Sequence, residues 1–383
     1  MRLRLAALAA CLALPAFAFA QQAPIQLPGT IGVTAYDTGS GGYNQAVAIG
    51  NALKQNLNVN LRILPGRNDV ARQAPLRDKR VPLSYHGVGS YFSQEGVFEF
   101  AARDWGPQPV RALLLNNSDQ LLTIITARDA NIRTLQDLRG KRVAWVAGAP
   151  ALNANVEALM AAVGLTWNDV QRVQFGGYGQ SMQGIINGQA DAGWASSIAG
   201  PLYQLEASPR GLHYPPLPAS DTKAWAWLRE NAPWFVQANG RDGAGLSAER
   251  PVHSTAYPYP ILIAYADVDE ALVYNFTRAM LTYFKDYETA APGNAGWALA
   301  RQRFDWAMPY HPGAIRALRE AGAWKPEHDA HNEALIRRQG VMIEAWRRYT
   351  ANAPEDAEAF KAGWMKARAE ALRAANLPVV FQE

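Results

Sequence analysis

The chain has 383 residues, of which 49% are hydrophobic and 18% are charged. This length and composition exclude a largely disordered chain and predict two, or at most three, compact units. The formal charge of +4 includes Arg2 and Arg4, and without them 35 basic residues face 33 acidic ones. Because the sequence also lacks a basic block, we expect no binding to nucleic acid.

The first twenty residues have the composition of an export signal. Arg2 and Arg4 form a basic start, residues 5–14 are mostly apolar, and residues 18–20 form a small-x-small cleavage site. We therefore predict a signal peptide over residues 1–20, cleavage after Ala20 and a periplasmic location. Cleavage as a lipoprotein at Cys11 is an alternative. Cys11 is the single cysteine, so the cleaved chain would have no thiol for a disulfide or for catalysis.

The residues after this segment alternate between strand-like and helix-like patterns. A first α/β unit is predicted from strands at 31–36, 59–64, 81–85 and 110–115, and from helices at 43–56 and 68–78. A second unit is predicted from strands at 121–126, 142–146, 170–175 and 190–195, and from helices at 134–138, 152–163 and 181–188. Such alternation indicates mostly parallel sheets that are flanked by helices.

A third strand-like run, residues 257–265, precedes a helix over 269–287, and helical patterns continue to about residue 375. We read this as a return of the chain to the first unit. The predicted domains are lobe 1 (28–117 plus 262–345), lobe 2 (118–261) and a C-terminal helical extension that packs on lobe 1 (346–383). No stretch after the signal reaches about 18 uninterrupted apolar residues, so we expect no membrane-spanning segment.

The glycine-rich stretch Gly39-Ser40-Gly41-Gly42-Tyr43-Asn44 lies between a predicted strand and a predicted helix. A dinucleotide-binding turn would need glycine in place of Asn44, and a P-loop would need Gly-Lys-Ser/Thr. The interpretation that remains is a helix start whose N–H groups bind a carboxylate. An ordinary strand-to-helix turn is the alternative.

Catalytic motifs are missing. No Gly-x-Ser-x-Gly elbow occurs, and the closest histidine pair, His328 and His331, has no obvious third metal ligand. We therefore predict that the protein is not an enzyme and has no cofactor or metal. Tyr85, Tyr178 and Trp194 follow or end predicted strands, where α/β proteins bind ligands.

Several segments resemble the TAXI family, the substrate-binding proteins of one branch of tripartite ATP-independent periplasmic (TRAP) transporters. They are "TGSGGYNQAVAIGNAL", "LLTIITARDANIRTLQDLRGKRVAWVAGAP", "VGLTWNDVQRVQFGGYGQSMQGIINGQADAGWASSIAGP" and "YPYPILIAYADVDEALVYNFTRAML", within residues 28–323. The resemblance implies a two-lobed α/β fold of the type II periplasmic-binding-protein kind. It also implies that the protein captures a small organic acid and delivers it to TRAP permease subunits. We expect the protein to be a monomer.

Carried over position by position, the resemblance places the ligand between the lobes. The expected ligand-binding residues are Ser40, Gly41, Gly42, Tyr43, Asn44, Arg67, Asn68, Tyr85, His86, Asn117, Pro150, Asn153, Tyr178, Trp194 and Ser196.

The sequence departs from the family at Pro150, Ala151 and Leu152, where family members usually carry hydroxyl groups. We therefore expect an acid that is flatter or more apolar than glutamate. Alternatives to a TRAP component are the binding protein of an ATP-driven importer for a thiamine precursor or sulfonate, a sensory protein, and an exported enzyme.

Overall fold

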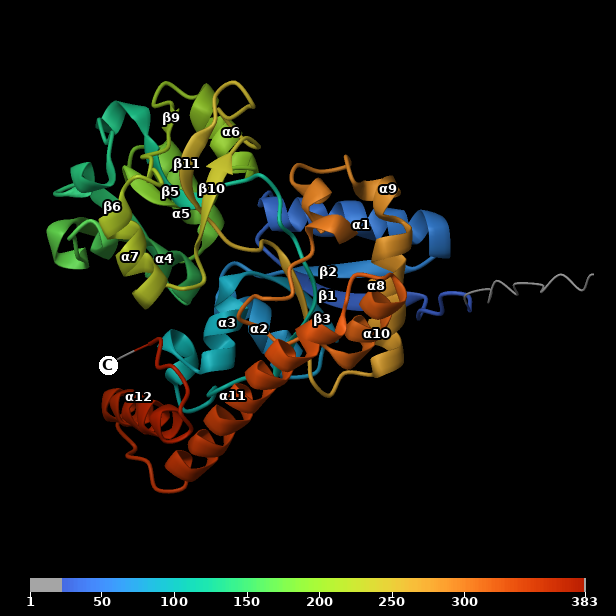
Figure 1. The fold of residues 1–383 in the computed structure, drawn as a ribbon. Helices are drawn as coiled ribbons and strands as arrows, with labels where there is room; N and C mark the ends of the chain where they lie inside the picture. Colours follow the sequence, from blue (N-terminus) through green and yellow to red (C-terminus); the bar gives the residue numbers. More distant parts are fainter. Residues whose placement is uncertain (1–22, 382–383) are drawn as a thin grey trace, which may run out of the picture.

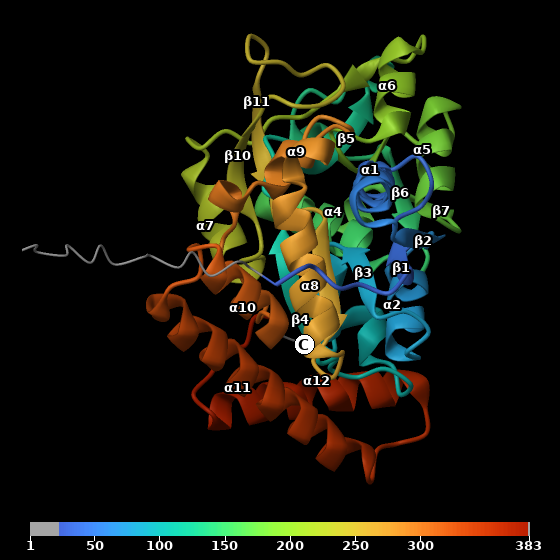
Figure 2. The same cartoon turned by 90° about the vertical axis from the view of Figure 1, so that its right-hand side faces the viewer.

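The computed structural model describes residues 23–381, which form two α/β lobes and a helical C-terminal region (Figures 1 and 2). The predicted two-lobed α/β fold is confirmed. The predicted signal peptide and Cys11 lie outside the described residues. Between residues 23 and 381, the helices are all too short or too polar to cross a membrane.

Lobe 1 contains a five-stranded sheet. In sheet order its strands are β2 (Asn60–Pro65), β1 (Thr30–Ala35), β3 (Leu83–His86), β12 (Ile261–Tyr265) and β4 (Val110–Leu115). Strand β1 is parallel to β2 and β3, whereas β12 is antiparallel to both of its neighbours. Every residue of β4 and β12 is buried, as expected for continuous apolar runs that are covered on both faces.

Helices pack around this sheet, and the first three of them start at the carboxyl ends of β1, β2 and β3. They are α1 (Gly41–Leu57), α2 (Asp69–Arg77), α3 (Val88–Glu95), α8 (Glu270–Thr282), α9 (Phe284–Tyr287) and α10 (Pro312–Glu320). Helix α1 begins at Gly41 because the Ser40 hydroxyl accepts a hydrogen bond from the Tyr43 amide (3.2 Å). The Asn68 side chain caps α2 in the same way through the Ala71 amide (2.8 Å).

Lobe 2 repeats this arrangement. Its sheet has the order β7 (Gln171–Phe175), β6 (Arg142–Val146), β8 (Ala192–Ser196), β5 (Leu122–Ala127) and β9 (Leu212–His213). Its helices are α4 (Pro150–Ala162), α5 (Tyr178–Ile186), α6 (Gly200–Ala207) and α7 (Thr222–Asn231). A hairpin of β10 (Val236–Gly240) and β11 (Val252–Ala256) leads back to lobe 1. The chain thus crosses between the lobes at residues 116–121 and 257–260.

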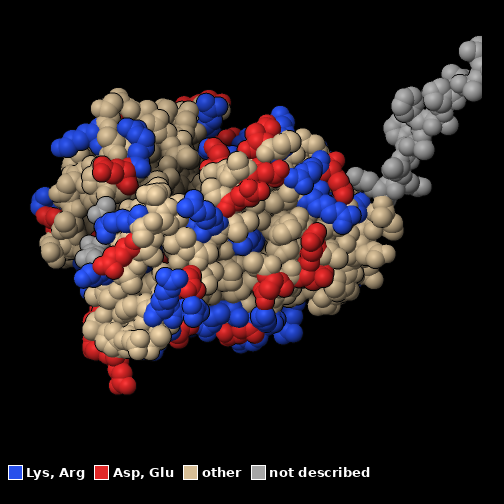
Figure 3. Space-filling model, turned by 60° about the horizontal axis from the view of Figure 1, so that its bottom comes forward, with Lys and Arg blue, Asp and Glu red and all other residues tan. Residues whose placement is uncertain are grey.

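The C-terminal region consists of α11 (Pro326–Thr350) and α12 (Ala357–Ala374). Helix α11 contacts α3, and α12 contacts residues 98–101 of lobe 1, so the region lies beneath both lobes in Figure 1. Helix α11 continues through Trp346, the residue at which we predict the extension to begin. On the face shown in Figure 3, which brings this underside forward, basic and acidic side chains are intermixed.

The structure differs from the sequence prediction in a few elements. The run at 257–265 is a strand only over Ile261–Tyr265, because Tyr257 to Pro260 form the crossing segment. The helix predicted at 134–138 is a single 3-10 turn, Leu135–Leu138. Helix α3 and the β10–β11 hairpin were not predicted. In the segment between α9 and α10, Tyr310 forms an isolated parallel bridge with Ala112 of β4.

Candidate functional site

A pocket lies between the two lobes. Five helices contribute their N-cap or first-turn residues to its lining: α1, α2 and α3 from lobe 1, and α4 and α5 from lobe 2. Strand β8 and the second crossing segment complete the wall. Because helix starts carry partial positive charge, this convergence favours a ligand with an acceptor or an anionic group.

Aromatic side chains form much of the pocket wall. Tyr36, Tyr178, Trp194, Tyr257 and Tyr259 all line it. Trp194 and Tyr257 are parallel, with ring centroids 6.4 Å apart, and Tyr36 and Tyr259 approach to 4.8 Å. Burial raises the pKa of each of the four tyrosines above its usual value, so their hydroxyls stay protonated. The wall is therefore flat, apolar and neutral.

A buried ion pair joins this aromatic wall. The Arg72 guanidinium pairs with the Asp69 carboxylate and lies 3.9 Å from the centre of the Tyr36 ring. Asp69 also accepts a hydrogen bond from the Ala151 amide at the start of α4 (2.8 Å). Burial raises the Asp69 pKa and outweighs the opposing effect of Arg72. The pair is thus nearly dry, and its two charges offset each other.

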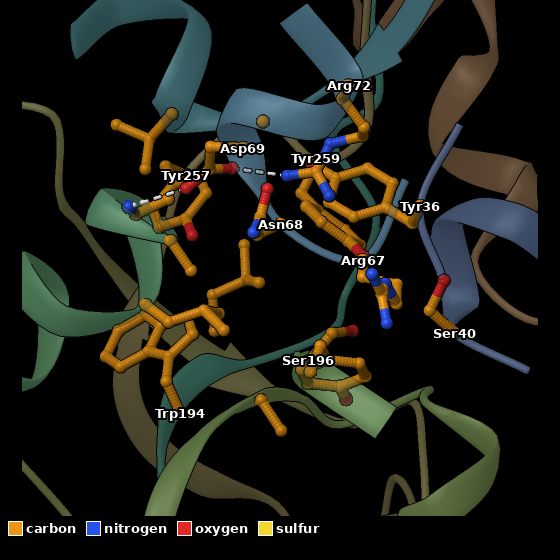
Figure 4. A pocket seen from close by; sticks show the side chains of 18 residues that line it. Tyr36, Ser40, Arg67, Asn68, Asp69, Arg72, Trp194, Ser196, Tyr257 and Tyr259 are labelled. Carbon is orange, nitrogen blue, oxygen red and sulfur yellow. Dashed lines mark hydrogen bonds and ion pairs between the residues drawn. The ribbon is translucent and has the colours of Figure 1, made fainter. Parts of the chain in front are cut away.

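Three donors in the pocket lack partners among the described residues. The Arg67 side chain lines the pocket, is exposed to solvent and makes no hydrogen bond or ion pair there. Nε of Arg72 and Nε1 of Trp194 are buried without a hydrogen bond. Trp194 nevertheless lies close enough to the Tyr257 hydroxyl to oppose the rise in the Tyr257 pKa that burial causes. In Figure 4 the two arginines lie beside Tyr36, and Trp194 lies at the other end.

Hydrogen bonds hold the two lobes together around the pocket. The Asp37 carboxylate accepts a hydrogen bond from the backbone amide of Gly179 at the start of α5 (3.1 Å). The side-chain amide of Asn68 donates one to the Ala147 carbonyl (3.1 Å). The Gly200 amide also donates to the Gly39 carbonyl (3.2 Å). The structure therefore represents a closed arrangement, in which carboxylates of lobe 1 already satisfy the starts of α4 and α5.

The structure brings together several of the expected ligand-binding residues. The pocket is lined by Ser40, Arg67, Asn68, Tyr178, Trp194 and Ser196. Gly41 and Gly42 lie next to it without lining it. A Cβ atom on Gly42 would be 2.4 Å from the Tyr36 ring, and one on Gly41 would be 2.9 Å from Ile198 of lobe 2. These glycines therefore make room for the pocket wall and for the opposite lobe.

Other expected residues lie elsewhere. Tyr85 is fully buried against Trp297 (centroids 6.1 Å apart), because alternate residues of β3 face opposite sides of the sheet. His86 lies behind the pocket, where its Nδ1 accepts from the Gly87 amide (3.1 Å) and where burial, then Arg72, lowers its pKa. Asn117 donates to the Arg301 carbonyl (2.8 Å) in the first crossing segment.

The remaining expected residues have local roles. Asn153 donates to and accepts from the Val146 backbone, and with Pro150 it lines a separate groove beside α12. Tyr43 packs on the core of lobe 1, and Asn44 faces away from the pocket in another surface groove.

Sequence reasoning missed Tyr36, Asp69, Arg72, Tyr257 and Tyr259. The two crossing tyrosines belong to "AYPYP", in which Pro258 and Pro260 interrupt a strand-like pattern. Prolines there indicate an end of the strand and could have located the crossing segment. Asp69 and Arg72 stand three residues apart on α2, a spacing at which an ion pair can form on any helix. No local pattern shows that the pair is buried beside the pocket, because that depends on how α2 packs between the lobes.

The described residues hold no group of three or more His, Cys, Asp and Glu side chains that could bind a metal ion. His328, one of the paired histidines, instead packs against Phe304 and Trp324. His331 contacts the Trp306 carbonyl through Nε2 (3.0 Å).

Two α/β lobes, two crossing segments and a pocket at the helix starts define a periplasmic-binding-protein-like fold. The chain belongs to the NMT1-like family, whose sequence model matches residues 39–322. No curated protein matches the sequence significantly.

Solved structures that resemble the chain include binding proteins of several kinds. The alkanesulfonate-binding protein SsuA from Xanthomonas axonopodis pv. citri, bound to MOPS, is 16% identical, with 93% of this chain and 96% of that chain covered and a TM-score of 0.45. The periplasmic aliphatic sulphonate binding protein SsuA from Escherichia coli is 14% identical, with 92% and 94% covered and a TM-score of 0.38. A mutant of ArgBP from T. maritima is 14% identical, with 68% and 92% covered and a TM-score of 0.41. Similarity at this level carries no information on the ligand.

Proposed function

We propose that this protein captures a small organic acid in the interlobe pocket, outside the cytoplasmic membrane, and delivers it to a membrane permease. The observation that carries this proposal is Arg67. Arg67 lines the pocket and has no ion-pair partner among the described residues, whereas Arg72 is already paired with Asp69. A single uncompensated positive charge favours a ligand with one carboxylate or a similar monoanionic group.

The rest of the pocket favours a flat, apolar ligand body. Tyr36, Tyr257, Tyr259 and Trp194 offer ring faces, and Leu152 adds an aliphatic contact. An extended polar acid such as glutamate carries a second carboxylate and an ammonium group. Neither group would find a free partner of opposite charge in the pocket, because the Arg72 guanidinium and the Asp69 carboxylate are paired with each other and Asp69 also accepts from the Ala151 amide.

Closure links binding to delivery. Ligand contacts with Arg67 in lobe 1 and with Trp194 in lobe 2 exist together only when the lobes are closed. A ligand can shift the lobes toward the closed form only by the difference between its affinities for the closed and open forms. A permease that recognises the closed form would then receive the loaded protein in preference to the empty one.

A thermal-shift series with benzoate, benzamide and glutamate tests this proposal. Benzoate should stabilise the protein, whereas benzamide, which has the same shape without the charge, and glutamate should not. The Arg67→Gln variant should bind benzoate about tenfold or more weakly, since a charge-assisted hydrogen bond contributes about 1.5–3 kcal/mol. The matched control is Arg62→Gln, which changes an arginine of β2 outside the pocket lining. Strong stabilisation by glutamate, with none by benzoate, would contradict the ligand class.

For the permease, we propose a TRAP-type carrier, on the basis of the resemblance of residues 28–323 to the TAXI family. The binding component of an ATP-driven importer is the alternative. The neighbouring genes distinguish the two, because a TRAP system requires a large integral-membrane permease and an importer requires an ATPase. A neighbouring ATPase without a TRAP permease would contradict the first assignment.

A further inference from the structure

The C-terminal segment, residues 378–381, reaches the interface between the two lobes. Phe381 stacks on Trp234, which lies between α7 and β10 of lobe 2, with ring centroids 5.6 Å apart and planes inclined by 18°. The same Phe381 ring meets Phe92 of α3 in lobe 1 edge-on at 5.6 Å. Phe381 is 8% exposed and Trp234 is 3% exposed. A single side chain near the end of the chain thus fills a space bounded by both lobes.

Two buried arginines hold this segment in place. Arg338 of α11 donates to the Pro378 carbonyl (2.6 Å), and Arg368 of α12 donates to the Phe381 carbonyl (3.2 Å). Both guanidiniums also bind the carboxylate of Glu95, the last residue of α3. Because Glu95 and Arg368 are fully buried, the backbone of the segment is fixed relative to lobe 1.

A continuous set of contacts leads from Phe381 to the pocket. The Trp234 indole N–H donates to Oδ1 of Asn155 (2.9 Å), and Nδ2 of Asn155 donates to the Tyr257 hydroxyl (2.9 Å). Asn155 is fully buried, so both of its hydrogen bonds are made in a dry environment. Tyr257 is the pocket residue that lies parallel to Trp194.

We propose that the C-terminal segment is an interlobe clamp that stabilises the closed form and, through Trp234 and Asn155, positions Tyr257 in the ligand pocket. Opening of the lobes would separate Trp234 from Phe92 and Phe381 and would expose all three rings to water. The clamp therefore contributes to the free energy of closure whether or not a ligand is bound. The proposal rests on the proposed function only in treating the pocket as the ligand site.

The distance between the lobes tests the clamp directly. Spin labels at Gln55→Cys in α1 and Gln204→Cys in α6, in the full chain with Cys11→Ser, report this distance by double electron–electron resonance without any ligand. We expect a closed population in the unaltered chain. Phe381→Ala should lower the closed-to-open ratio about two- to tenfold, the range given by the contribution of an aromatic pair.

The matched control is Phe304→Ala. The Phe304 ring contacts Tyr310, Trp324 and His328, all outside lobe 2, so its loss should leave the distance distribution unchanged. Trp234→Ala should open the lobes at least as much as Phe381→Ala, because the Trp234 ring also meets Phe92 of lobe 1 edge-on at 5.1 Å. The double variant should be no more open than Trp234→Ala, because Phe381 has no ring contact to lobe 2 among the described residues once Trp234 is removed. Phe381→Leu, which keeps an apolar side chain, serves if Phe381→Ala does not fold.

Three results would overturn the clamp: a distribution without a closed population in the unaltered chain, an unchanged distribution in folded Phe381→Ala or Phe381→Leu, or additive effects in the double variant. Since no solute is added, the benzoate series and this measurement can fail independently of each other.

Discussion

Removal of the Glu95 charge should destabilise the protein strongly. Glu95 is fully buried at the end of α3, and its carboxylate accepts from Nε (2.8 Å) and Nη2 (2.6 Å) of Arg338 and from Nη2 of Arg368. Glu95→Gln keeps the shape of the side chain but leaves two guanidinium groups without a counter-charge in a dry site. Loss of one partner of a buried ion pair costs about 3–5 kcal/mol, and we expect a loss of this size in the free energy of unfolding.

Urea denaturation followed by circular dichroism is the appropriate assay, because urea is uncharged and does not screen ion pairs. Glu344→Gln is the matched control. Glu344 also pairs with two arginines, Arg347 and Arg348, but these side chains are 73% and 74% exposed. Solvent screens such pairs, so this variant should keep the urea midpoint of the unaltered protein. A loss below about 1 kcal/mol for Glu95→Gln, or equal shifts for the two variants, would refute the reasoning.

Two further predictions concern pH and the glycine turn. Burial alone would raise the pKa of Glu95, but Arg338 and Arg368 outweigh this effect and hold the pKa below its usual value. The stabilisation by the Glu95 carboxylate should therefore be complete near neutral pH and should be lost as the pH falls through the lowered pKa. Urea midpoints from pH 7 to pH 3 check this: the gap between Glu95→Gln and the unaltered protein should shrink with acid, and a constant gap would contradict it. Gly42→Ala should displace Tyr36 from the pocket and weaken benzoate binding, since the new methyl group would lie 2.4 Å from its ring. Isothermal titration calorimetry with benzoate checks this, with Gly29→Ala as the control. A methyl group at Gly29 meets no atom within 4 Å, so this variant should bind benzoate normally, and equal affinities for both variants would contradict the packing role of Gly42.

Much of the fold could be predicted because apolar runs mark buried strands directly. The strands predicted at 110–115 and 142–146 match β4 and β6 residue by residue. The β10–β11 hairpin escaped prediction because its strands are only half buried and flank a loop rich in glycine. Helix α3 escaped because all of its residues are buried, which removes the contrast between an apolar and a polar face.

Part of the ligand pocket could also be predicted from local sequence patterns. Residues that start helices after strands, such as Ser40, Asn68 and Tyr178, can be located from local patterns, and the structure places all three in the pocket lining. The burial of the Asp69–Arg72 pair and the Phe381 contact depend on segments that are distant in sequence. Their positions follow from how the lobes and the C-terminal region pack, which no local pattern encodes.

The position of β12 has a consequence for how the chain folds. This strand lies between β3 and β4, yet the whole of lobe 2 separates it from them in the sequence. The sheet of lobe 2 is built from one uninterrupted stretch, so it can form early. The facing edges of β3 and β4 must stay unpaired until residues 261–265 arrive, which makes lobe 1 the slower lobe to fold and the one exposed to aggregation on the way.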